Sequence, residues 1–79
     1  MAKPKWDAKP ITMSPVNSSN IEEVGYDTDT QTLQVKFHSG KSFQYAAVPE
    51  SIHDEMLNAA SVGGYFMANI RGAYPYRQI

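Results

Sequence analysis

Residues 32–45 read TLQVKFHSGKSFQY, and this is the most regular stretch of the chain. Apolar and polar residues alternate from Leu33 to Phe37, and a period of two is the pattern of a half-buried β-strand. The alternation resumes at Phe43 and Tyr45, after a Ser-Gly step that is typical of a turn. The stretch therefore predicts a β-hairpin. Its strands are expected over residues 32–37 and 41–48.

The turn of this hairpin decides where the aromatic rings lie. A loop of two residues, Ser39-Gly40, would leave Phe43 and Tyr45 on the polar face, open to solvent. A loop of three residues, which adds His38, turns both rings to the apolar face of the preceding strand and gives glycine the left-handed position that such turns need. We favour the longer loop, because it sorts apolar from polar side chains completely. The two rings are then mainly core residues.

The segments on either side of the hairpin complete an α+β fold. Residues 21–26 predict a preceding strand. Pro49 suits the first position of a helix, with Ser51 as an alternative start two residues later. Ser61 suits the N-cap of a second helix that ends near Gly72. We therefore expect a three-stranded antiparallel β-meander followed by two short helices packed on one face.

The length of the chain allows one domain. Its 79 residues have a mass of 8.8 kDa, which is too little for a second core. Residues 1–15 hold three prolines among scattered lysines and predict a flexible N-terminal tail. The domain is expected over residues 16–74, and residues 75–79 are expected to form a C-terminal tail.

The composition argues against catalysis and against membrane insertion. No apolar run is long enough to span a membrane, and no secretory signal or cysteine is present, so we expect a cytoplasmic protein. His38 and His53 have neither metal-ligand spacing nor a sequence partner that suggests a catalytic dyad. We expect no enzyme activity, no metal, no cofactor and no small-molecule substrate.

Aromatic residues and arginines gather in residues 57–79, which contain no acidic residue. Aromatic rings that stack on bases, beside guanidinium groups that bind phosphate, are typical of sites for single-stranded nucleic acid. The competing interpretation is structural, because Tyr74 continues the helical spacing of Phe66 and Ile70. The net charge of -1 also differs from the basic charge of dedicated nucleic-acid binders.

Several short motifs, in order from Val16 to Tyr74, resemble the KTSC domain, a small bacterial and phage module. The motifs are VNSSNI (16–21), VGYD (24–27), LQVKF (33–37), FQY (43–45), YF (65–66) and IR (70–71). The family carries a Tyr-x-Tyr signature where this chain has Phe43-Gln44-Tyr45, so the hydroxyl of the first tyrosine is absent here. The family takes its name from its occurrence at the C-terminus of some lysyl-tRNA synthetases.

The resemblance implies a non-catalytic binding module in its stand-alone form, and the synthetase context points to tRNA or another structured RNA as ligand. The residues expected to contact RNA are Lys36, Lys41, Ser61, Tyr65, Arg71, Tyr74, Tyr76 and Arg77.

The alternative is a protein-interaction or self-associating accessory protein of a bacterium or phage. Trp6 is the candidate partner anchor, since tryptophan is a favoured hot spot of interfaces. Self-association is expected through the edge of the strand over residues 21–26, where Gly25 indicates a bulge or a close neighbour.

Overall fold

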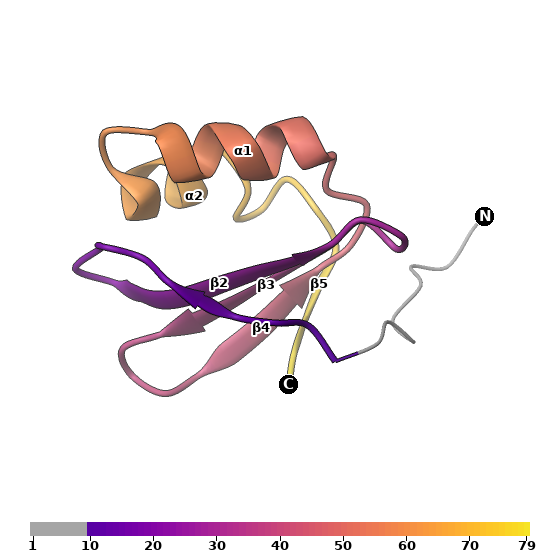
Figure 1. The fold of residues 1–79 in the computed structure, drawn as a ribbon, viewed down its shortest axis with the longest axis horizontal. Helices are drawn as coiled ribbons and strands as arrows, with labels where there is room; N and C mark the ends of the chain where they lie inside the picture. Colours follow the sequence, from indigo (N-terminus) through magenta and orange to yellow (C-terminus); the bar gives the residue numbers. More distant parts are fainter. Residues whose placement is uncertain (1–9) are drawn as a thin grey trace.

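The computed structural model describes residues 10–79, which form a sheet with two helices above one of its faces (Figure 1). The predicted α+β class is confirmed. The helices are α1, Glu50–Asn58, and α2, Val62–Asn69. The strands are β1 Ser14–Pro15, β2 Ile21–Asp27, β3 Thr32–Phe37, β4 Ser42–Tyr45 and β5 Tyr76–Gln78. Trp6 and the first nine residues of the predicted tail lie outside the described residues.

The prediction of three strands is wrong, because the antiparallel sheet has five, in the order β1-β2-β3-β4-β5. The two additional strands come from the segments that we assigned to tails. Ser14 pairs with Val24 at one edge, and Tyr76 pairs with Tyr45 at the other. Both added strands are very short and are held largely by backbone hydrogen bonds, such as the one from Ile79 N–H to the carbonyl of Ser42.

The hairpin between β3 and β4 has the register of the three-residue loop, as we favoured. Val35 pairs with Phe43, and Leu33 pairs with Tyr45. Gly40 has φ 93°, the left-handed conformation that this loop requires. In this register, the polar residues of both strands share the face of the sheet opposite the helices.

The strand β2 is not an edge strand, because β1 occupies the edge through which we expected self-association. β1 pairs with its middle, and the segment before β1 lies over Gly25. A Cβ atom on Gly25 would stand only 2.6 Å from the backbone oxygen of Thr12. Gly25 thus marks a close neighbour, whereas the bulge of β2 lies between Ile21 and Glu23.

The core lies between the sheet and the helices. Its fully buried large apolar side chains are Ile21, Leu33, Val35, Val48, Met56, Phe66 and Ile70. The helix α1 begins at Glu50 with Pro49 as its N-cap, so the later start at Ser51 is wrong and Pro49 lies one position earlier than expected. The Ser61 hydroxyl accepts a hydrogen bond from Gly64 N–H, which confirms the predicted cap of α2. Neither helix of the described part is long and apolar enough to cross a membrane.

Candidate functional site

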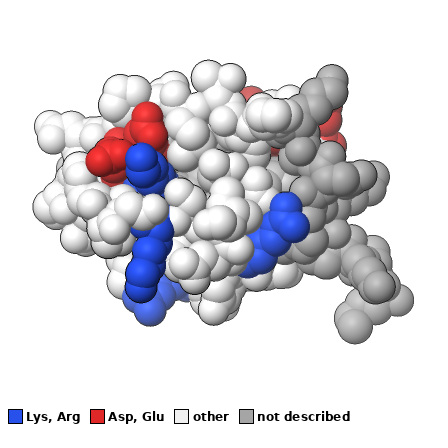
Figure 2. Space-filling view, turned by 90° about the horizontal axis from the view of Figure 1, so that it is seen from below, with Lys and Arg blue, Asp and Glu red and all other residues white. Residues whose placement is uncertain are grey.

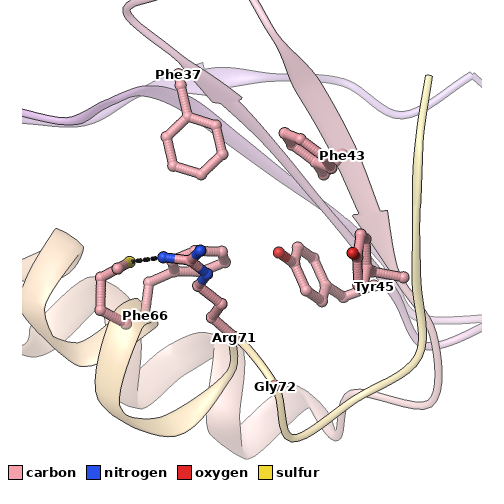
Figure 3. Close-up of a pocket in the computed structure, with 8 residues that line it drawn as sticks. Phe37, Phe43, Tyr45, Phe66, Arg71 and Gly72 are labelled. Carbon is pink, nitrogen blue, oxygen red and sulfur yellow. Dashed lines mark hydrogen bonds between the residues drawn. The ribbon is translucent and has the colours of Figure 1, made fainter.

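An aromatic pocket of about 480 Å³ opens between the end of α2 and the strands β4 and β5 (Figure 3). It is lined by Phe37, Phe43, Tyr45, Phe66, Met67, Arg71, Gly72 and Tyr76. The alternation along β4 turns its two aromatic residues toward the helices, and the pairing of β5 adds Tyr76 beside them. We call this site the aromatic pocket.

The rings of the aromatic pocket hold one another in fixed orientations. Phe66 contacts Tyr45 edge-to-face at a centroid distance of 5.3 Å and contacts Phe37 in the same way at 5.7 Å. Tyr76 stacks on Tyr45 at 5.6 Å and lies 6.1 Å from Phe43. These distances are those of favourable aromatic pairs. Phe66 is 1% exposed and Tyr76 is 60% exposed, so the floor of the pocket is packed and one wall faces solvent.

The hydroxyl of Tyr45 is a polar group of the aromatic pocket. The residue is only 4% exposed, yet its ring points into the pocket, on the side of Arg71 (Figure 3). No hydrogen-bond partner for this hydroxyl is found among residues 10–79. The hydroxyl is accessible to solvent, because every solvent-inaccessible polar side-chain atom of that part has a hydrogen-bond partner. Burial raises the pKa of Tyr45, and Arg71 opposes that shift, so the hydroxyl keeps its proton at neutral pH.

Arg71 places a positive charge at the rim of the pocket. Its backbone N–H donates to the carbonyl of Phe66 at 3.0 Å, and the chain then turns at Gly72, where φ is 83°. The guanidinium Nη1 lies 3.7 Å from the Met67 sulfur. In the described part of the chain no carboxylate forms an ion pair with Arg71. The charge is therefore open to an anionic ligand.

Arg77 lies on the other face of the sheet, although it follows Tyr76 directly. Residues alternate between faces along β5, so Arg77 turns away from the pocket and donates to Gln44 Oε1 at 2.9 and 3.1 Å. On the same face Lys36 forms an ion pair with Glu22 at 3.2 Å. Figure 2 shows the basic side chains of this face in two separate groups, one of which adjoins acidic side chains. A continuous basic patch is not formed there.

The eight residues expected to contact RNA are therefore scattered, and only Arg71 and Tyr76 meet at the aromatic pocket. Lys41 is exposed at the turn before β4, and the Ser61 hydroxyl is engaged as a helix cap. Tyr65 and Tyr74 are half-buried and pack against the core.

Sequence reasoning missed the other ring residues of the pocket, because it assigned Phe43 and Tyr45 to the core. The signal that pointed to them is the Tyr-x-Tyr signature of the family that the sequence resembles. Tyr45 keeps the second hydroxyl of that signature and now lies inside a pocket. Phe37 and Phe66 carry no polar group that would mark them in the sequence.

A family model described as KTSC domain matches residues 17–74. A lysine–tRNA ligase from Trichormus variabilis is 41% identical over 61 residues, which are 77% of this chain and 11% of the ligase. A protein from Tsukamurella paurometabola is 42% identical over 53 residues, which are 67% of this chain and 79% of that protein.

A solved structure is similar over nearly its whole length. The crystal structure of a KTSC domain protein from Yersinia pestis has a TM-score of 0.85 and 36% identity, and the match covers 89% of this chain and 99% of that one. The relation is thus to small proteins along most of their length and to a region of much longer ligases. The chain belongs to the KTSC domain family.

Proposed function

We propose that this KTSC domain is a small, non-catalytic module of the cytoplasm that binds RNA through the aromatic pocket. The observation that carries the proposal is the exposed ring of Tyr76 next to an arginine without a carboxylate partner in the described residues. Aromatic faces bind bases by stacking, and a guanidinium binds phosphate. The aromatic pocket offers both groups within one site.

The relatives support RNA as the ligand class. The ligases that match this chain are named for tRNA, and the matching region is 61 residues long. Because this chain spans only 11% of the ligase from Trichormus variabilis, the ligation activity belongs to the rest of that protein in our proposal. A binding role suits a region that recurs in small separate proteins.

The charge of the domain sets the strength of this binding. Between residues 10 and 79 the chain has seven acidic residues and four lysines or arginines. Electrostatic attraction to the phosphate backbone is therefore small, and contacts of bases with rings must supply most of the affinity. We expect weak binding that depends on salt only moderately.

An amide NMR titration of the labelled protein with tRNA, at about 50 and 200 mM salt, tests the proposal. We expect shifts in Phe43, Tyr45, Arg71 and Tyr76, which weaken at the higher salt. Lys36, on the opposite face of the sheet, serves as the internal control. Shifts confined to that opposite face, or no shifts at either salt, would reject the site.

Self-association is a second candidate, and the edge strand β5 is the observation that favours it. Tyr76 and Ile79 expose more than half of their surface, and within residues 10–79 the outer edge of this strand has no neighbouring strand. Such an edge can pair with another strand. Sedimentation at several protein concentrations tests this candidate, and a single monomeric species at all concentrations would reject it.

A further inference from the structure

Building on the proposed RNA binding, we infer that the aromatic pocket takes one unpaired nucleobase. The base lies among the rings, its polar edge meets the Tyr45 hydroxyl, and its phosphate meets Arg71. The inference goes beyond RNA binding in general, because it names the part of the RNA that is recognised and the residue that reads it.

The shape of the pocket requires an unpaired base. Its floor is formed by Phe66 and Tyr45, which are almost completely buried, so a ligand must enter the pocket to reach them. In a double helix both faces of each base are covered by neighbouring bases, and the deep major groove of RNA is closed to side chains. A base in a loop, a bulge or a single strand exposes the face and the edge that the pocket can contact.

The Tyr45 hydroxyl favours a base over an apolar side chain of a protein. A ligand that fills the pocket removes water from this hydroxyl, for which the described residues provide no partner. A buried hydroxyl without a hydrogen bond is costly. An apolar side chain in the pocket would leave the Tyr45 hydroxyl without a partner and would therefore bind more weakly. The edge of a base carries donors and acceptors and can replace the lost water.

Arg71 limits the contact with the backbone to about one phosphate. Among residues 10–79 it is the cationic residue that lines the pocket, and Arg77 is directed to the opposite face of the sheet. A guanidinium binds phosphate with paired hydrogen bonds. A nucleotide, with one flat ring and one phosphate, therefore matches the chemistry of the pocket.

The substitution Tyr45→Phe tests the inference, because it removes the hydroxyl and keeps the ring. Fluorescence anisotropy would compare a labelled single-stranded RNA hexamer of mixed sequence with a blunt duplex of the same sequence. We expect the hexamer to bind the wild type at least about tenfold more tightly than the duplex does. We expect Tyr45→Phe to lower hexamer affinity about twofold to tenfold, as for one lost hydrogen bond.

Tyr65→Phe is the matched control, since it removes a tyrosine hydroxyl outside the pocket. It should leave hexamer affinity unchanged, and thermal unfolding should show that both variants are folded. Equal loss in the two variants, or no loss in Tyr45→Phe, would overturn the inference.

Comparing the hexamer, the duplex and folded tRNA distinguishes a failure of this inference from a failure of the proposed function. If the duplex or folded tRNA binds and the hexamer does not, the single-base mode is wrong and RNA binding stands. If no RNA binds, both this inference and the proposed function are wrong. Pocket shifts caused only by a peptide with an aromatic side chain would then assign the site to a protein partner.

Discussion

The ring of Tyr76 stacks on the ring of Tyr45, with centroids 5.6 Å apart and planes inclined by 29°. The two residues are 31 positions apart in the sequence and are paired across β4 and β5. One ring is buried and the other is mostly exposed, so the pair joins the core to the surface. The last strand of the sheet thereby supplies one wall of the aromatic pocket.

The first prediction concerns this exposed ring. We expect Tyr76→Ala to weaken binding of single-stranded RNA by about 1–3 kcal/mol, the usual effect of one lost base–aromatic stack. Ile79→Ala is the control, because it also removes a large exposed apolar side chain at the same end of the chain. Anisotropy titrations would measure both variants. An equal effect in both would mean that general loss of apolar surface, and not Tyr76, explains the change.

The second prediction concerns Ser61, which the sequence offered as an RNA contact and the structure shows as a cap. We expect Ser61→Ala to lower the free energy of unfolding by about 0.5–2 kcal/mol, because Gly64 N–H loses its hydrogen-bond acceptor. RNA affinity should stay the same in the folded variant. Urea unfolding followed by circular dichroism measures the first effect, and a variant as stable as the wild type would contradict the assigned role.

The third prediction concerns Tyr26, which links the sheet to the start of α1. Its hydroxyl donates to the carbonyl of Val48, and its ring stacks on His53 at 4.8 Å. We expect Tyr26→Phe to reduce the free energy of unfolding at pH 7 by about 1 kcal/mol, the usual contribution of one hydrogen bond. Urea unfolding measures this difference.

The difference in unfolding free energy between the wild type and Tyr26→Phe depends on pH. Burial, and then Glu50 and Asp54, raise the pKa of Tyr26 above its ordinary value of 10.0. The folded state thus holds the proton more tightly than the unfolded state. Its stabilising effect is complete below pH 10 and is lost as the pH rises through the folded pKa. The advantage of wild type over Tyr26→Phe should shrink above about pH 10, and a constant difference would contradict this.

The central hairpin could be predicted from the sequence because a repeated physical pattern determines it. The alternation in residues 32–45 defines the faces of β3 and β4, and complete sorting of apolar side chains selects one register. Gly40 then has the conformation that this register needs. The cap at Ser61 was equally predictable, since its side chain acts on a backbone group three residues away.

The edge strands could not be predicted, because their order comes from partners that are distant in the sequence. Ser14–Pro15 and Tyr76–Gln78 are too short to show an alternation, and each is adjacent to a proline or contains one. They are strands because β2 and β4 offer free backbone groups. The placement of Arg77 depends on β5 in turn, so treating residues 75–79 as a tail also misplaced a candidate site residue.

The two arginines provide the most direct test of the central claim, that RNA binds at the aromatic pocket. Arg71→Gln and Arg77→Gln remove the same charge from opposite faces of the sheet. For each protein one would measure the affinity for single-stranded RNA at several salt concentrations. One phosphate contact gives a slope of about -0.7 in a plot of log affinity against log salt.

We predict a slope of about -0.7 for the wild type and for Arg77→Gln. For Arg71→Gln we predict weaker binding and a slope near zero, with both variants folded by circular dichroism. A slope lost in Arg77→Gln and kept in Arg71→Gln would contradict the claim and place the RNA on the opposite face of the sheet.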